Sequence, residues 1–333
     1  MNKIVIIGGG AAGYFTAINA KEKNPELDIT ILEKGKEVLQ KVKISGGGRC
    51  NVTHACFEPK ELVKFYPRGE KELLGPFHQF MTGDTFEWFD DRGVPLKIEG
   101  DNRVFPEANT SQAIVDCFQK AVDALDIKVL TNHGVNSVNR QDGKWLLHTK
   151  EQVFKADKLV IAAGSSKKIW ELCATLDHAV IAPVPSLFTF NINDKRLVDL
   201  LGISVPNATV KVVGTKLEAS GPLLITHWGM SGPAVLKLSA FGARILADKN
   251  YQYNVEVNWL SRPTDKVLNV LLNLKKKEPR KTVILKSPFT EISRRLWERF
   301  VLFSDISKTQ NWADLNSSQL EKLANELTKG MYN

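Results

Sequence analysis

Residues 3–33 read KIVIIGGGAAGYFTAINAKEKNPELDITILE, and this stretch decides the fold. The apolar run 3–7 predicts a strand that is buried on both faces of a parallel sheet. A G-x-G-x-x-G pattern follows at once, and residues 11–23 predict a helix that begins inside it. A second apolar run, 28–32, predicts the next strand and leads to Glu33. Together they predict the strand–helix–strand unit of a Rossmann-like α/β domain.

Each glycine of the pattern has a physical role in dinucleotide binding. Gly8 permits the tight turn out of the strand, Gly10 lets the backbone approach a pyrophosphate, and Gly13 lets the helix pack against the strand. The helix N-terminus at Ala11-Ala12 offers free N–H groups and a partial positive charge. Glu33 is placed to accept hydrogen bonds from the ribose of an adenosine, and its charge disfavours NADP. FAD and NAD both carry the adenosine half that this pattern predicts.

A second glycine cluster favours FAD over NAD. Residues 43–54 read KISGGGRCNVTH, and the glycines at 46–48 expose backbone N–H groups. Ser45 and Asn51 add short polar side chains, and Arg49 adds a cation. Such a loop suits an extended ligand that runs past the first strand–helix–strand unit. The alternative is a flexible surface loop.

A third segment agrees with this interpretation. The runs 135–138, 144–149 and 153–154 alternate like a small antiparallel ribbon. Residues 158–164 then predict a buried strand that ends in Ala-Ala-Gly. This layout resembles that of the glutathione-reductase-like flavoproteins. The resemblance implies that residues 162–164 lie beside the ADP moiety of the cofactor.

Longer motifs carry a more specific resemblance. Besides GGGAAG and SGGGRCN, the chain contains DRGVPLKIEGDNRVFP (91–106), LVIAAGSS (159–166), PVPSL (183–187) and PLLITHWGMSGPAVLKLS (222–239). With these motifs the sequence resembles a bacterial flavoprotein family that includes aminoacetone oxidases and BaiN-type bile-acid reductases. The resemblance covers nearly the whole chain. It implies an FAD-dependent oxidoreductase that passes a hydride or two electrons between flavin and a small organic substrate.

The same resemblance implies a Rossmann-like FAD/NAD(P)-binding fold of the glutathione-reductase type with two inserts. We expect the FAD-binding domain at residues 1–185, a β-barrel-type insert at 186–262 and a helical subdomain at 263–333. Strand-like runs with Gly/Pro turns before residue 260 agree with the barrel-type insert. Apolar residues at three-to-four spacing after residue 265 agree with the helical part.

The expected cofactor-binding residues come from the two glycine clusters, the end of the second strand, the ribbon and the Ala-Ala-Gly strand end. They are Gly8, Gly10, Ala11, Ala12, Gly13, Glu33, Lys34, Ser45, Gly46, Gly47, Gly48, Arg49, Cys50, Asn51, Val135, Ala162, Ala163 and Gly164. His227, in the THWGMSGP motif, is a candidate for a substrate-facing acid or base. A histidine that is satisfied inside a barrel turn is the alternative.

The resemblance also raises an expectation about the flavin ring. Members of the resembled family continue with a glycine-rich segment that covers the ring and returns to the FAD-binding domain. This chain stops at residues 330–333, and no such segment is present in it. We therefore expect the 333-residue chain to bind FAD weakly or to be isolated without it, since lost ring contacts remove buried apolar area and hydrogen bonds.

Composition and charge are those of a globular protein with an ample core. The chain of 333 residues is 43% hydrophobic and 25% charged, with a formal net charge of +8. We interpret the positive charge as spread along the chain, and its densest run, 275–277 with Arg280 and Lys281, as a solvated helix end. No aromatic-interleaved RNA motif accompanies that run. Nucleic acid is therefore not expected as a partner.

Cysteine usage and apolar runs exclude other classes. The four cysteines form no C-x-x-C pair, and Cys50, His54 and Cys56 supply only three candidate metal ligands. No metal site is expected. No apolar run reaches eighteen residues and the N-terminus is not a signal peptide, so we expect no membrane span and a cytoplasmic location.

Two alternative functions stay open at this point. A NAD-dependent dehydrogenase would use the first unit for NAD and would need a catalytic domain with an evident acid or base. A non-catalytic protein could instead bind nucleotide or nucleic acid through its basic surface. The sequence does not indicate the substrate, the electron acceptor or the oligomeric state.

Overall fold

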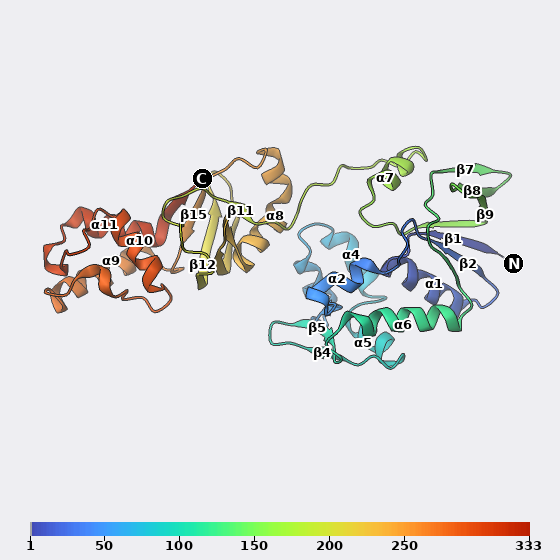
Figure 1. Ribbon diagram of the computed structural model, residues 1–333, viewed down its shortest axis with the longest axis horizontal. Coiled ribbons are helices and arrows are strands. Elements are labelled where there is room, and N and C mark those ends of the chain that lie inside the picture. The colour runs from blue at the N-terminus through green and yellow to red at the C-terminus, as the bar shows by residue number, and fades with distance from the viewer. Residues whose placement is uncertain (1) are drawn as a thin grey trace. The chain divides into compact units, whose positions relative to one another are not determined.

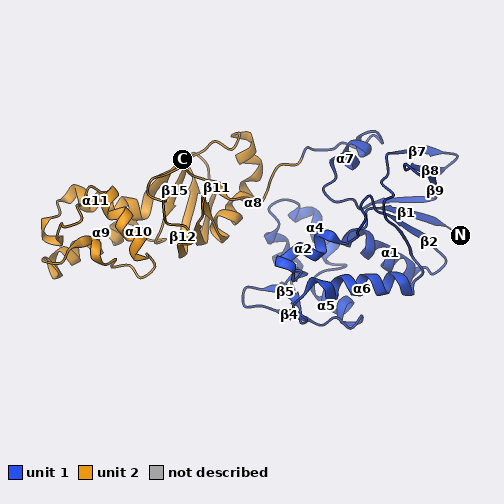
Figure 2. Cartoon of the chain, in the orientation of Figure 1, with its two compact units in different colours: residues 1–182 blue, residues 183–333 orange. Residues whose placement is uncertain are grey.

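The computed structural model describes residues 2–333. The chain divides into two compact units, and the division falls between Ala182 and Pro183 (Figure 2). We call residues 2–182 unit 1 and residues 183–333 unit 2. Within residues 2–333, no helix combines the length and apolar character that crossing a membrane requires.

Unit 1 is built on a four-stranded parallel sheet with the order β10-β1-β2-β6. Figure 1 labels its strands β1 and β2, with α1 and α6 nearby. The helices α1 and α6 pack together with this sheet around one apolar core. The predicted strand–helix–strand unit is confirmed. The bounds are β1 Lys3–Ile7, α1 Ala11–Lys23, β2 Asp28–Leu32, α6 Ser111–Ala124, β6 Lys128–Leu130 and β10 Lys158–Ile161.

A helical excursion with a small antiparallel sheet lies between β2 and α6. Its sheet has the order β3-β5-β4. Helix α2 extends into the segment that the sequence analysis treated as a loop, because residues 40–44 are helical before the glycines begin. The bounds are α2 Gln40–Gly48, β3 Thr53–His54, α3 Pro59–Leu62, η1 Val63–Phe65, α4 Glu70–Phe77, α5 Thr82–Asp90, β4 Leu96–Ile98 and β5 Arg103–Pro106.

The antiparallel ribbon predicted between the third and last parallel strands is present. It is a three-stranded sheet of β7 Ser137–Gln141, β8 Lys144–His148 and β9 Val153–Ala156. Its first strand begins two residues later than predicted, although the Asn136 N–H already donates to the His148 carbonyl of β8 at 2.8 Å. Helix α7, Lys167–Ala174, follows β10.

Unit 2 is built on a six-stranded antiparallel sheet with the order β11-β14-β13-β12-β15-β16. Helix α8 packs against β12 and β13. The bounds are β11 Phe190–Asn191, β12 Ser204–Val212, β13 Glu218–Ile225, β14 Gly229–Ser231, α8 Pro233–Asp248, β15 Val255–Asn258 and β16 Gly330–Tyr332.

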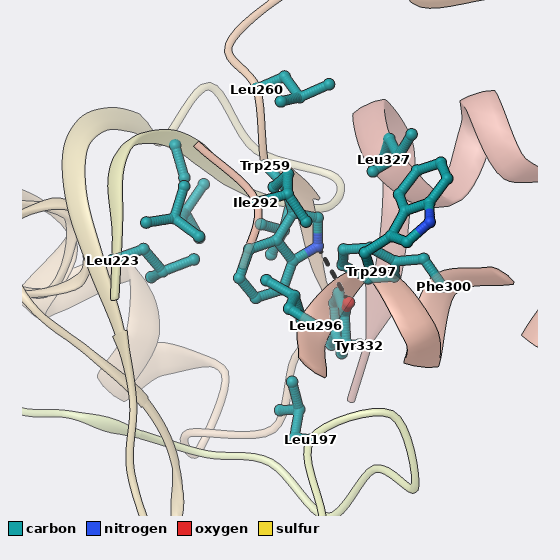
Figure 3. Packing of buried hydrophobic residues seen from close by; sticks show 14 of the residues in the cluster. Leu197, Leu223, Trp259, Leu260, Ile292, Leu296, Trp297, Phe300, Leu327 and Tyr332 are labelled. Carbon is teal, nitrogen blue, oxygen red and sulfur yellow. Dashed lines mark hydrogen bonds between the residues drawn. The ribbon is translucent and has the colours of Figure 1, made fainter. Parts of the chain in front are cut away.

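The helical part of unit 2 shares one hydrophobic core with this sheet. Trp259, Phe300 and Tyr332 pack together, and the Trp259 indole N–H donates to the Tyr332 hydroxyl at 3.1 Å (Figure 3). Strands thus give way to helices near residue 262, but one core spans that point. The bounds are α9 Thr264–Lys277, η2 Val283–Leu285, α10 Arg294–Phe303, η3 Trp312–Asp314 and α11 Ser317–Lys329.

A buried ion network ties the last strand of this sheet to the start of the unit. Arg196, only 5% exposed, donates to Asp194 at 2.7 Å and to Glu326 at 2.6 Å, and also to the Met331 carbonyl. Its guanidinium lies 3.9 Å from the centre of the Tyr332 ring. Burial alone would raise the pKa of Asp194, but the hydrogen bonds and charge of Arg196 hold that pKa below its usual range. Sequence reasoning missed this network.

Candidate dinucleotide site

In the glycine turn at residues 8–13, two of the three pattern glycines have no room for a side chain, and the third has room. Gly8 has a φ of +117°, and a Cβ there would lie 2.5 Å from the Ala162 carbonyl oxygen. A Cβ on Gly13 would overlap the carbonyl oxygen of Gly8. A Cβ on Gly10 would meet nothing within 4 Å. Contacts within the protein therefore require glycine at positions 8 and 13. They do not require it at position 10, where a ligand could approach the backbone.

Helix α1 begins directly at this open glycine. Its first intrahelical bond runs from the Tyr14 N–H to the Gly10 carbonyl at 3.1 Å. The N–H groups of Ala11 and Ala12 precede it and have no intrahelical acceptor. Together with the helix dipole they favour an anion at this end. The turn thus combines an open cradle with the polarity that a pyrophosphate requires.

The Glu33 carboxylate braces the same turn. One of its oxygens accepts the Gly9 N–H at 2.8 Å, and the other accepts the Gly35 N–H at 2.7 Å. A carboxylate offers about four lone-pair positions, so about two remain for a ribose diol. Glu33 therefore has a structural role that the sequence did not indicate, and it retains acceptors for the predicted one.

The segment before the ribbon joins this side of the site. The His133 N–H donates to the Glu33 carbonyl at 2.8 Å. A Cβ on Gly134 would lie 3.2 Å from the Lys34 Cβ. Val135 follows and is buried. Two expected cofactor-binding residues that are a hundred positions apart, Lys34 and Val135, are thereby brought to one edge of the parallel sheet.

The end of β10 borders the glycine turn. The Ala162 N–H donates to the Ile7 carbonyl at 2.8 Å, and the Ala162-Ala163 backbone fills the space beside Gly8. Lys41 of helix α2 reaches this strand end, where its ammonium donates to the Ser165 hydroxyl at 2.6 Å. Lys41 is a cation beside the site that sequence reasoning missed, because its partner lies 124 positions away.

The second glycine cluster is an ordered turn. Gly46 and Gly47 have left-handed backbones, with φ of 56° and 68°, and the Cys50 N–H donates to the Ser45 carbonyl at 3.0 Å. A Cβ on Gly46 would lie 2.6 Å from the Asn51 nitrogen, so the turn closes on itself there. A Cβ on Gly47 or Gly48 would meet nothing within 4 Å, as at Gly10. The cluster thus forms a defined turn that is closed at Gly46 and open at Gly47 and Gly48.

The side chains behind these glycines are largely engaged within the protein. The Arg49 guanidinium pairs with Glu99, donates to Asn109 at 2.7 Å and lies 3.9 Å from the centre of the Phe105 ring. It is a fixed cation, as predicted, but Glu99 offsets its charge. Burial raises the pKa of the Cys50 thiol, so this cysteine is not set up as a reactive thiolate.

His227 lies outside this group of residues, on the tight turn between β13 and β14 of unit 2. Its side chain is exposed, and its one ring contact is with Trp228 at a centroid distance of 6.5 Å. Within residues 2–333 it has no hydrogen-bond partner, so the turn does not satisfy its imidazole. The neighbouring Gly229 is explained by packing, because a Cβ there would lie 2.5 Å from the Phe190 carbonyl oxygen.

The open glycine, the helix N-terminus, the acidic brace and the ribbon before the last strand define a Rossmann-type dinucleotide-binding protein. The chain belongs to the family described as HI0933-like protein Rossmann domain, which matches residues 2–330. The family predicted from the motifs is confirmed. Among residues 2–333, no cluster of three or more His, Cys, Asp or Glu side chains is arranged to hold a metal ion.

Individual relatives agree with this family assignment. The chain is 25% identical over 270 residues to the 3-dehydro-bile acid delta(4,6)-reductase of Clostridium scindens, covering 78% of this chain and 65% of that protein. It is 27% identical over 251 residues to the ribosomal RNA dihydrouridine synthase of Haemophilus influenzae, covering 71% and 61%. The chain thus spans somewhat less than two thirds of the length of these relatives.

A solved structure is similar at a lower level. The bacillithiol disulfide reductase of Staphylococcus aureus is 24% identical, with a TM-score of 0.28, over 49% of this chain and 39% of that one. A similarity of this size carries no argument about function.

Proposed function

We propose that this protein is an FAD-dependent oxidoreductase. The observation that supports this most directly is the open space at Gly10, between two glycines that packing against backbone requires. Open space at Gly47 and Gly48 gives a second stretch of accessible backbone in the same unit. Two such stretches suit an extended dinucleotide, and membership of the family whose motifs resemble those of flavoproteins favours FAD over NAD.

Each part of the site has a task toward that cofactor. The turn at Gly10 and the N-terminus of α1 would hold the pyrophosphate. Glu33 would accept hydrogen bonds from the ribose, and Lys41 would add positive charge near the strand end. FAD, when bound, supplies the transfer of a hydride or two electrons. The protein's own residues fix where that cofactor lies.

The relatives' names suggest the class of reaction. One relative is named as a delta(4,6)-reductase of a 3-dehydro bile acid, and another as a synthase of dihydrouridine in ribosomal RNA. Both names describe hydrogen added to a carbon–carbon double bond that is conjugated with a carbonyl group. We propose the same class here: one carbon of such a bond accepts a hydride and its neighbour accepts a proton. His227, exposed and without a hydrogen-bond partner in residues 2–333, is the candidate donor of that proton.

The test is an equilibrium titration of the purified chain with FAD and, separately, with NAD. We expect FAD to bind and to be the tighter ligand. Gly10→Val should weaken FAD affinity by at least about a hundredfold, since its side chain fills the cradle. The free energy of unfolding should change by less than about 0.5 kcal/mol, because the space is open and the φ of −94° is allowed.

Gly83→Val is the matched control. Gly83 lies in the first turn of α5 in unit 1, and a Cβ there also meets nothing within 4 Å. FAD affinity of this variant should stay within about twofold of wild type. Wild-type affinity in Gly10→Val, or tighter binding of NAD than of FAD, would contradict the proposal. A cytoplasmic location stays a prediction from the sequence.

A further inference from the structure

The positive charge of the chain is not spread along its length, as predicted, but belongs to one unit. Unit 2 carries 21 Lys and Arg against 13 Asp and Glu, which makes its net charge +8. Unit 1 carries 24 of each and is neutral. A dinucleotide held by unit 1 does not account for this charge, so the excess in unit 2 needs an explanation of its own.

A hollow lies along the outer side of helix α10 in unit 2. Its volume is about 400 Å³, which is within the range of small-molecule sites. Arg295, Arg299 and Leu302 line it and follow one another at i, i+4 and i+7, so they share one side of the helix. The rest of the lining comes from Leu200, Ile284, Glu298 and Lys308.

The cations of the hollow outnumber the carboxylates that could neutralise them. Its lining includes three cations and one carboxylate, and that carboxylate, Glu298, is paired with Arg294 at 3.0 Å. The Asp199 carboxylate approaches Arg299 only at 3.7 Å and is exposed. Lys308 is exposed and has neither an ion pair nor a hydrogen bond within residues 2–333. The hollow therefore keeps an excess of positive charge.

The two arginines of the hollow are held in place mainly by backbone carbonyls. Arg295 donates to the Asp199 carbonyl, and Arg299 donates to the Val198 carbonyl at 3.1 Å. In contrast, Arg196 of the same unit pairs with two carboxylates. A guanidinium has five N–H donors, so each arginine of the hollow keeps donors and charge for a second partner. Guanidinium groups that are already oriented lose less entropy when they bind an anion.

Apolar side chains form the other part of the lining. Leu302 is 38% exposed, and it lines the hollow together with Leu200 and Ile284. A free inorganic anion would use the charge and leave these side chains without a contact. The combination fits an organic anion whose apolar body covers Leu302 while its charged group contacts the arginines.

The number of cations distinguishes between the common organic anions. A carboxylate has two oxygens and a single charge. A phosphate monoester has three terminal oxygens and a charge near −2 at about pH 7. Three cations around one hollow match the second group better, and arginine suits phosphate oxygens in particular.

We propose that this hollow binds a small phosphate monoester with an apolar body. The proposal is separate from the proposed function, because the residues that line the hollow all belong to unit 2. It assigns a second anion site to the chain, besides the glycine turn at residues 8–13.

The test is a titration of the full chain with phenyl phosphate and, separately, with inorganic phosphate, followed by ³¹P NMR at low salt. Phenyl phosphate should bind about tenfold more tightly, because part of its ring is buried against the apolar side chains. An excess of phenylacetate should displace it poorly. Gly10→Val, which fills the turn in unit 1, should bind phenyl phosphate within about twofold of wild type.

Two variants separate the charge of the hollow from its apolar lining. Lys308→Gln should weaken both ligands at least about threefold, since it removes a charge without breaking a contact in the described chain. Leu302→Ser should weaken phenyl phosphate about threefold and leave inorganic phosphate within about twofold. Thermal unfolding of each variant shows whether it is folded.

Helix α9 supplies the matched controls. Lys266 is an exposed lysine without an ion pair in the part of the chain that the structure describes, and Leu272 is 39% exposed, close to the value for Leu302. Neither residue lines the hollow. Lys266→Gln and Leu272→Ser should bind both ligands within about twofold of wild type.

Four results would overturn the proposal. They are equal losses in Lys308→Gln and Lys266→Gln, equal affinity for phenyl phosphate and inorganic phosphate, efficient displacement by phenylacetate, and loss of phenyl phosphate binding in Gly10→Val. A single-stranded oligonucleotide that binds through Lys308 while phenyl phosphate does not bind would also overturn it, since the cations would then serve a polymer.

Discussion

Two turns of this chain contain glycines that serve different purposes. In the turn at residues 8–13, Gly10 faces open space while its neighbours in the pattern pack against backbone. In the turn at 226–233, both Gly229 and Gly232 are closed, with Cβ positions 2.5 Å and 2.7 Å from carbonyl oxygens. The first turn has room for a ligand, and the second uses its glycines to let β14 pass between its neighbouring strands. The space around a glycine, rather than its presence, distinguishes the two roles.

The largest effect is expected at the closed turn. Gly229 has a φ of +143°, so Gly229→Ala combines backbone strain with overlap onto the main chain of β11. We expect a loss of at least about 3 kcal/mol in the free energy of unfolding, measured by chemical denaturation. A loss below about 1 kcal/mol would show that the turn adapts to a side chain, and that glycine is not required at position 229.

A smaller effect is expected at Glu33, whose carboxylate accepts two backbone N–H groups beside the turn at residues 8–13. Glu33→Ala removes two backbone hydrogen bonds and the ribose acceptors. FAD affinity should fall about 10- to 100-fold, as expected for charge-assisted hydrogen bonds worth about 1.5–3 kcal/mol. Unlike Gly10→Val, this variant should also lose about 1 kcal/mol of stability or more. Equilibrium titration and thermal unfolding together check both parts, and unchanged affinity would place Glu33 outside the site.

The smallest effect is expected at the tip of the closed turn. His227 is exposed and makes only a ring contact with Trp228, so His227→Ala should change the free energy of unfolding by less than about 0.5 kcal/mol. Paired denaturation curves of this variant and Gly229→Ala measure the contrast between adjacent parts of one motif. A large loss in His227→Ala would reveal a structural role that the contacts do not indicate.

Local chemistry made the first part of the fold predictable. The bounds of β1, α1 and β2 match the sequence prediction, because apolar runs, a glycine pattern and a helix stop are all read within a few residues. Long-range partners made the rest unpredictable. Lys41 and Ser165 are 124 positions apart in the sequence, and Arg49 and Glu99 are 50 positions apart. Only folding brings each pair into contact.

The same reason limited the prediction of unit 2. Apolar spacing predicted the helices after residue 265, but it did not indicate that β16 would complete the sheet at its far edge. Nor did it indicate that the segment at Lys281 would meet the segment at 310–312 through backbone hydrogen bonds.

The ion network at Arg196 has a consequence for how the protein is made. Its partners Glu326 and Met331 lie 130 and 135 positions further along the chain. At synthesis rates of roughly 5–20 residues per second, Arg196 waits roughly 7–26 s for the carboxylate that completes its pairing. Strand β15 ends at Asn258, 72 positions before β16 begins at Gly330, so for the later part of that time its outer edge has no neighbour. Exposed strand edges invite wrong pairing between chains. Nascent chains of this protein should therefore depend on chaperones until residues 326–332 have left the ribosome.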